Sequence, residues 1–149
     1  MLLSGMRGKN YGVEHLLAPF SGDLDHILDA TLGLKTERVD FLLTIGALYF
    51  GNKRIHDRNI QIENQAYLRV HTHPRRFPAE IFDFKKSLIE ETEDYVVINK
   101  PSGLPVHPTV DNQIENIASL IAKELNHEIH VTHRLDVGTS GLLILAKNK

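Results

Sequence analysis

One polar segment near the end of the sequence carries residue types that could do chemistry together. Residues 133–147 read HRLDVGTSGLLILAK, which places the guanidinium of Arg134 two positions before the carboxylate of Asp136 and ahead of a hydrophobic run. A polar loop between two strands presents such groups at a rigid sheet edge, where functional side chains are commonly fixed. The residues alone leave two interpretations of Asp136 open: a functional carboxylate, or a structural salt bridge or loop cap.

The same segment holds the three residue types of a hydrolase triad, in His133, Asp136 and Ser140. Ser140 does not lie in the G-x-S-x-G turn that exposes a nucleophilic serine. Three triad members within eight residues also rarely converge on one site. The sequence therefore disfavours a hydrolase.

The chain has nine histidines and no cysteine, which raises the question of a metal site. His71 and His73 could share a strand face, and His127, His130 and His133 recur every third residue. No carboxylate or thiolate pattern completes either set, and histidines at the surface or in hydrogen bonds are far commoner. We expect no metal site.

The apolar spacing around the polar segment predicts the elements that would position it. Strands are expected at residues 95–99 and 129–132. Residues 142–146 are nearly continuous in apolar character, so we expect a strand that is buried on both faces. A helix begun by Asp111 or Asn112 is predicted between them. Its apolar stripe comprises Ile114, Ile117, Ala118, Ile121 and Leu125.

Two helices are predicted in the first half of the chain. The first ends at Gly33 and has Ser21 or Asp23 as its N-cap. The second is capped by Thr36 and extends to Ile45, where a glycine follows. Their inner faces comprise Leu24, Ile27, Leu28 and Leu32 in the first helix, and Val39, Leu42 and Leu43 in the second.

A hairpin and a strand follow these helices. Residues 47–55 are expected to turn at Gly51-Asn52, and residues 67–71 to form a strand. Pro74 and Pro78 then interrupt a basic stretch that reads as a linker. The residues before the first helix show no clear period and predict an arm or a short strand.

Two motifs in the second half resemble those of a known enzyme family. The segment HRLDVGTSGLLILAK resembles the HRLDxxTSGLxxxAK motif of the RluA-type pseudouridine synthases. The upstream run VVINKPSGLPVHP, residues 96–108, resembles that family's first motif, N-K-P-x-G followed by V-H-P. The two motifs also occur in the family's order, which makes the resemblance specific.

The resemblance implies an enzyme that isomerises uridine to pseudouridine in rRNA or tRNA without a cofactor or metal. Asp136 matches the catalytic carboxylate, which acts as a nucleophile or as a base at the ribose. Arg134 matches the residue that enters the space left by the displaced base. The remaining matched residues would shape or support the site: His133, Thr139, Ser140, Gly141, Lys100 and Pro101.

The first half resembles the small S4-type RNA-binding domain that often accompanies these enzymes. The cues are LGLKTER at residues 32–38, Ile45-Gly46, and the hairpin, in which Gly-Asn replaces the usual Asn-Gly. Basic side chains there and in the linker are the expected RNA contacts: Lys35, Arg38, Lys53, Arg54, Arg75 and Arg76.

These features predict an α+β chain in three parts. An S4-like domain with an N-terminal arm spans residues 1–74, and a basic-then-acidic linker spans 75–94. Residues 95–149 would be the start of a catalytic domain with a mixed or antiparallel sheet. The family's domain continues with a tyrosine and a basic residue, so we expect a truncated chain that is inactive alone. The alternative is a catalytically silent RNA-binding or assembly module.

Bulk properties set limits on partners. The net charge of −2 excludes a uniformly basic, non-specific nucleic-acid binder, although local basic clusters leave RNA binding open. No apolar run reaches the length of a membrane span, and residues 1–12 lack a signal-peptide core, so we expect a cytoplasmic protein. A severed sheet would also predict self-association through the strand at 142–146.

Overall fold

The computed structural model describes residues 12–149, so the expected N-terminal arm lies largely outside the described residues. The chain divides into two compact units with a boundary between Arg75 and Arg76. Both units combine helices with antiparallel sheets, which confirms the α+β class. No helix within residues 12–149 is long and apolar enough to cross a membrane.

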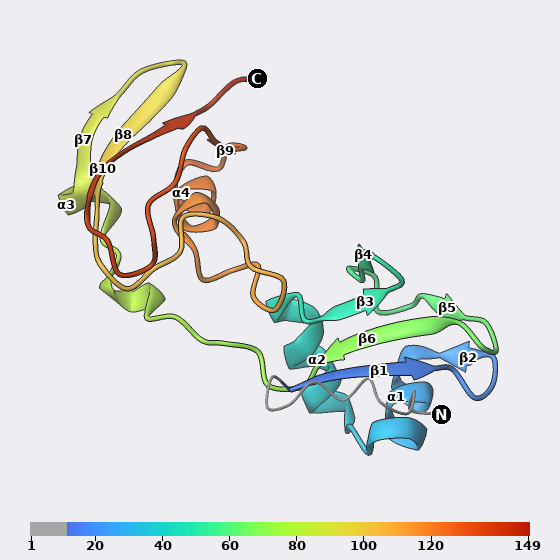
Figure 1. The fold of residues 1–149 in the computed structure, drawn as a ribbon. Coiled ribbons are helices and arrows are strands. Elements are labelled where there is room, and N and C mark those ends of the chain that lie inside the picture. The colour runs from blue at the N-terminus through green and yellow to red at the C-terminus, as the bar shows by residue number, and fades with distance from the viewer. Residues whose placement is uncertain (1–11) are drawn as a thin grey trace. The chain divides into compact units, whose positions relative to one another are not determined.

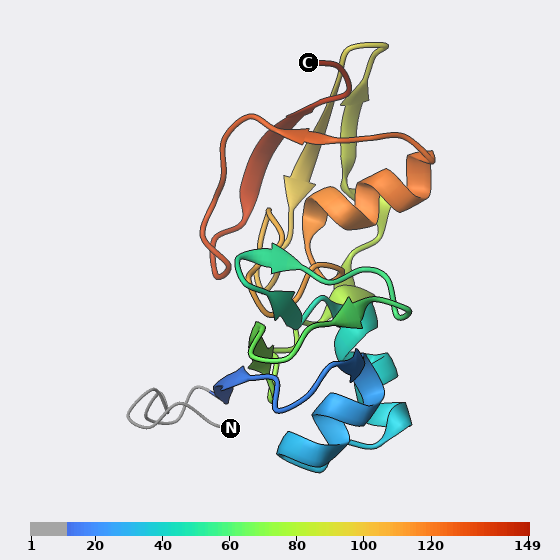
Figure 2. The ribbon, with the colours of Figure 1, turned by 90° about the vertical axis from the view of Figure 1, so that its right-hand side faces the viewer.

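Unit 1 contains two helices and a four-stranded antiparallel sheet with strand order β1-β6-β3-β4 (Figures 1 and 2). A separate pair of short strands, β2 and β5, completes the unit. The elements are β1 (Val13–Leu17), β2 (Gly22–Asp23), α1 (Leu24–Leu32), α2 (Thr36–Ile45), β3 (Leu48–Phe50), β4 (Lys53–Arg54), β5 (Gln61–Ile62) and β6 (Tyr67–His71).

Local signals fix most helix ends in unit 1. The Asp23 carboxylate accepts a hydrogen bond from the His26 amide at 2.8 Å, and Gly33 ends α1 with φ of 68°, so both predictions are confirmed. The predicted cap of α2 is wrong. Thr36 is already helical, and Lys35 occupies the N-cap position without a side-chain hydrogen bond.

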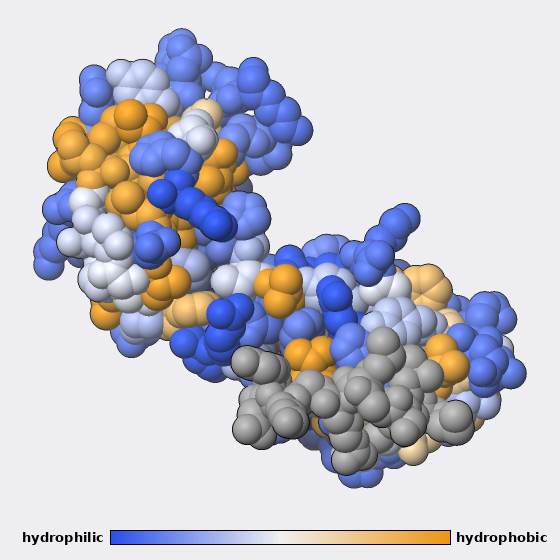
Figure 3. Space-filling view, in the orientation of Figure 1, coloured by the Kyte–Doolittle hydropathy of each residue, from blue (hydrophilic) through white to orange (hydrophobic). Residues whose placement is uncertain are grey.

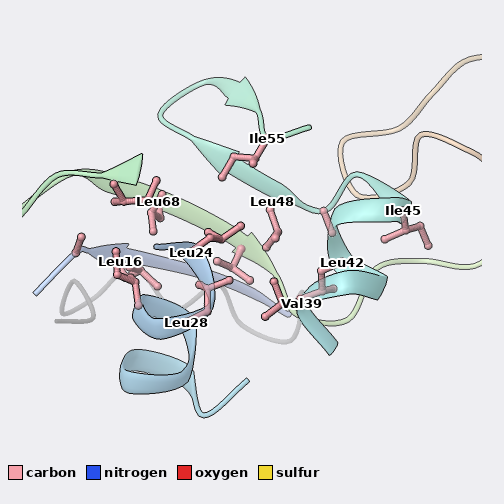
Figure 4. Packing of buried hydrophobic residues seen from close by; sticks show 14 residues of the cluster. Leu16, Leu24, Leu28, Val39, Leu42, Ile45, Leu48, Ile55 and Leu68 are labelled. Carbon is pink, nitrogen blue, oxygen red and sulfur yellow. The ribbon is translucent and has the colours of Figure 1, made fainter. Parts of the chain in front are cut away.

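The core of unit 1 forms where the helical stripes meet the inner face of the sheet (Figure 4). Leu68 and Val70 alternate with outward side chains on β6, as expected for a half-buried strand. The predicted hairpin is confirmed, because β3 and β4 pair across the turn at residues 51–52. The buried set includes Leu16, Leu24, Ile27, Leu28, Val39, Leu42, Ile45 and Leu48.

Unit 2 is built on an antiparallel sheet with strand order β7-β8-β10-β9. Helix α4 packs through Ile117 and Ile121 against one face of this sheet, where the inward side chains of β8 and β10 are buried. The elements are η1 (Ala79–Ile81), α3 (Phe84–Ser87), β7 (Leu88–Glu91), β8 (Tyr95–Lys100), α4 (Ile117–Leu125), β9 (His130–Val131) and β10 (Gly141–Ala146).

Strand β10 differs from its prediction in its burial. Leu143 and Leu145 are buried, but Leu142 and Ile144 are 64% and 46% exposed, so the strand is buried on one face only. The reason is that α4 covers only one face of the sheet. Figure 3 shows apolar side chains gathered on the surface of this unit. β10 also lies between β8 and β9, but β9 pairs only with its Leu145 and Ala146, so self-association through this strand stays a prediction.

Two further expectations change with tertiary context. Helix α4 begins later than predicted, with Asn116 as its N-cap, whereas the Asn112 carboxamide accepts hydrogen bonds from the amides of the preceding turn. The segment expected to be a linker, residues 75–94, contains η1, α3 and β7, and β7 pairs with β8. The predicted domain boundaries themselves stay a prediction.

Two neighbouring leucines provide a matched test of this one-sided sheet. Leu143→Ala removes a fully buried side chain and should destabilise unit 2 by about 2–5 kcal/mol. The identical change at exposed Leu142 should stay within about 0.5 kcal/mol. Urea-dependent amide exchange at Ile98 on β8 would measure both, and equal effects of the two substitutions would contradict the assignment of the buried face.

Candidate active site

Asp136 lies in the loop that connects β9 to β10, and its side chain is exposed. Arg134, two residues earlier, is also exposed. Successive side chains of the loop point in alternate directions. Leu135, between these two residues, packs against the core of unit 2, so its neighbours face solvent. Among residues 12–149, no hydrogen bond or ion pair occupies the Asp136 carboxylate or the Arg134 guanidinium. The described structure therefore gives no support to a salt bridge or loop cap for Asp136.

The backbone of the loop, in contrast, is held by a buried ammonium. Lys100, the last residue of β8, is 0% exposed. Its Nζ donates to the carbonyl oxygens of Thr139 at 2.8 Å, Pro101 at 3.0 Å, and both Asp136 and Val137 at 3.3 Å. Burial lowers the pKa of Lys100, because desolvation disfavours the charged form. These carbonyl dipoles supply the partners that such a charge requires.

Two residues of the first motif add to this attachment, although sequence reasoning did not single them out. The Gly103 amide donates to the Val137 carbonyl at 2.7 Å, and the Ser102 hydroxyl donates to the Gly138 carbonyl at 2.8 Å. Gly103 has φ of 111°, a backbone conformation that favours glycine. The spacing K-P-S-G is the signal that could have identified them.

The other predicted site-shaping residues lie along the same loop. Gly141 begins β10 and is the register partner of Lys100, so the two motifs meet at one strand pair. Thr139 closes a turn through a hydrogen bond from its amide to the Asp136 carbonyl. His133 reaches β10, where its Nε2 lies 3.1 Å from the Ile144 amide nitrogen.

No hydrogen bond within the described residues joins Ser140 to His133, so the arrangement offers no hydrolase triad. In residues 12–149, no group of three His, Cys, Asp or Glu side chains could hold a metal ion. What the loop presents is one exposed carboxylate and one exposed guanidinium on a fixed backbone.

The basic residues predicted to contact RNA are in several different environments. Lys35 pairs with Asp29 at 2.8 Å. Arg38 donates to the Thr72 carbonyl at 2.6 Å, and Arg54 donates to the Gly46 carbonyl at 2.9 Å. Lys53, on β4, is exposed.

Arg75 and Arg76 lie on either side of the boundary between the units. The Arg76 guanidinium pairs with the Glu115 carboxylate, which Asn112 also contacts. Burial alone would raise the pKa of Glu115, but the hydrogen bonds from Arg76 and Asn112 outweigh it and lower that pKa. Arg76 therefore has a structural partner that its sequence context did not indicate.

Replacing the buried ammonium should loosen the loop. Lys100→Met keeps most of the side-chain volume but removes the donor to the loop carbonyls. Amide exchange at Gly103 and Thr139 should become roughly tenfold faster. Lys123→Met, the same change at an exposed position on α4, is the control and should leave both amides unchanged. Unchanged exchange in Lys100→Met would show that the loop does not depend on this ammonium.

Residues 94–149 match the family model described as RNA pseudouridylate synthase. An uncharacterized RNA pseudouridine synthase of Mycoplasma pneumoniae is 32% identical over 132 residues, which cover 85% of this chain and 43% of that protein. A human pseudouridylate synthase is 38% identical over 105 residues, or 68% of this chain and 18% of the relative.

A chloroplastic RNA pseudouridine synthase of Oryza sativa is 38% identical over 100 residues, which cover 64% of this chain and 21% of that protein. The chain thus spans less than half the length of these relatives. The matched segment contains the exposed carboxylate, its loop and the strand pair that holds both motifs. Residues 94–149 therefore belong to the RNA pseudouridine synthase family, as part of its catalytic domain.

Proposed function

We propose that this chain is part of an enzyme that isomerises uridine to pseudouridine in structured RNA, either rRNA or tRNA, with Asp136 as the catalytic carboxylate. The observation that carries the proposal is that the backbone and the side chain of Asp136 are in different environments. Its backbone carbonyl is held by Lys100, while its carboxylate is exposed and has no partner within the described residues. A reacting group needs this combination of fixed position and free functional atoms.

The proposed reaction requires no net oxidation or reduction. The bond between uracil N1 and ribose C1′ breaks, the base rotates, and a bond forms between C5 and C1′. C5 releases a proton and N1 ends with one. The exposed carboxylate of Asp136 is the group that can act as a nucleophile or as a base at the ribose.

Arg134 has the properties that displacement of the base requires. Removing a nucleotide from its stack costs a few kcal/mol, which must be offset by new contacts. A planar guanidinium can stack on the exposed neighbouring bases and pair with phosphate. Arg134 is exposed on the same short loop as Asp136 and is therefore placed to act on the same nucleotide.

We further propose that unit 1 is an S4-like RNA-binding domain within residues 1–74, and that it precedes a catalytic domain to which residues 95–149 belong. Support comes from the two helices, the hairpin and the antiparallel sheet in the expected order. Phosphate contact by exposed cations such as Lys53 would add a salt-sensitive, sequence-independent contribution to affinity.

The catalytic proposal is tested by Asp136→Asn, which is nearly isosteric and removes the reactive charge. Uridine isomerisation on bulk RNA by the full-length protein should fall by at least about a thousandfold, with folding unchanged. Asp94→Asn, the same change at an exposed position in unit 2, should retain full activity. Retained turnover in Asp136→Asn would remove Asp136 from this role. RNA binding without turnover in the unaltered protein would instead favour a silent RNA-binding module.

The RNA-binding proposal for unit 1 has its own matched pair. Lys53→Gln removes an exposed charge and should reduce the slope of log affinity against log salt by about one. Arg58→Gln removes a charge that already contacts the carboxylates of Asp25 and Asp40, so its effect on the slope should be smaller. Filter binding to structured RNA at several salt concentrations measures both, and identical slopes in the two variants would argue against this surface.

A further inference from the structure

Strand β9 ends before the loop that carries Asp136 begins. It pairs with β10 at only two positions, Val131 with Leu145 and His130 with Ala146. Alternate residues of an antiparallel strand direct their backbone groups to the same neighbour. Ile144, two residues before Ala146, is therefore the next residue of β10 whose N–H and C=O face the side of β9.

Two side chains take over the pairing of Ile144 where the backbone ladder stops. The Thr132 hydroxyl donates to the Ile144 carbonyl oxygen at 2.6 Å. The Ile144 amide donates to Nε2 of His133 at 3.1 Å. Both polar groups of one backbone position are thus satisfied by consecutive side chains. The chain can leave the sheet at this point without leaving those groups unpaired.

The contact with Ile144 sets the chemical state of His133. An imidazole nitrogen accepts a hydrogen bond only when it carries no proton, so Nε2 is the acceptor and a neutral ring carries its proton on Nδ1. In this state the Nε2 lone pair is committed to the backbone of β10. His133 is therefore not placed to serve as a proton acceptor for a substrate through that nitrogen.

The loop is consequently anchored on both sides of its functional residues. His133 attaches it to β10 immediately before Arg134, and Lys100 holds the carbonyl of Asp136 on the other side. Only two residues separate His133 from Asp136, and one of them, Leu135, packs against the core. A shift of His133 would be transmitted directly to the Asp136 carboxylate, because few torsions lie between them.

We propose that His133 is a positioning residue for Asp136, acting through the Ile144 amide, with Thr132 as its partner. This inference rests on the function proposed above. It assigns His133 no contact with RNA and no proton transfer. Because the bond is solvent-exposed, water can replace it at little cost in stability, so the expected loss is in the order of the loop.

The test compares two substitutions of His133 in the full-length protein. His133→Gln can present its Oε1 near the position of Nε2 and keep the acceptor, whereas His133→Leu removes it. In His133→Leu, amide exchange at Ile144 should become about tenfold faster. kcat for uridine isomerisation should fall between about tenfold and a hundredfold, with KM unchanged. His133→Gln should restore both quantities to within about threefold.

His127→Leu is the matched control, since His127 is an exposed histidine of unit 2 whose ring nitrogen contacts only the neighbouring Glu128 carbonyl among the described residues. It should change neither quantity. Thr132→Val, which removes the hydroxyl that donates to the Ile144 carbonyl, should also accelerate exchange of amides in the loop. An NMR measurement of the His133 ring should show that Nε2 accepts a hydrogen bond from the Ile144 amide in the unaltered protein.

Several results would overturn the inference. They are an unprotected Ile144 amide in the unaltered protein, full activity in His133→Leu, or a higher KM at constant kcat, which would indicate contact with RNA. Failure of glutamine to rescue would assign the role to the ring itself. If the unaltered protein shows no isomerisation, the proposed function fails instead, and the exchange and NMR measurements still decide whether His133 holds the loop.

Discussion

The buried ammonium of Lys100 is the interaction on which the candidate active site depends. A charge removed from water is costly unless every donor finds a partner. Here the partners are main-chain carbonyls of the first motif and of the loop, at Pro101, Asp136, Val137 and Thr139. Any loop conformation that withdrew these carbonyls would leave the ammonium uncompensated. The cost of desolvating the Lys100 ammonium therefore favours the backbone conformation that positions Asp136.

The sheet of unit 2 places both ends of that arrangement. Lys100 ends β8 and Gly141 begins β10, and the two residues are register partners. Their strands are kept together by inward side chains such as Ile98 and Leu143, which pack under α4. The hydrophobic core thus fixes the register of β8 and β10, and this register places Lys100 beside the loop that carries Asp136. A slip of one residue would reverse the faces of β10 and separate Lys100 from the loop.

Sequence reasoning succeeded where the structure is determined locally. Helix α1 and the turn at residues 51–52 follow from a capping residue, a glycine and short-range periodicity. It failed where the answer depends on distant packing. The burial of β10 depends on how many faces of the sheet other elements cover. The start of α4 depends on which possible capping residue, Asp111, Asn112 or Asn116, precedes the first turn that packs against the core. Thr132 lies outside both motifs, and only the coordinates reveal its contact with Ile144.

The charge of the chain gives a further reason for placing a cation, Arg134, close to the carboxylate of Asp136. The chain has a net charge of −2, and Arg58 and Arg76 are occupied by carboxylates. RNA would therefore be held less by bulk attraction than by shape and by a few local cations. An isolated carboxylate at such a surface would repel the phosphates beside its target. If the proposed function holds, the guanidinium of Arg134, exposed on the same loop, would offset that repulsion at the target nucleotide.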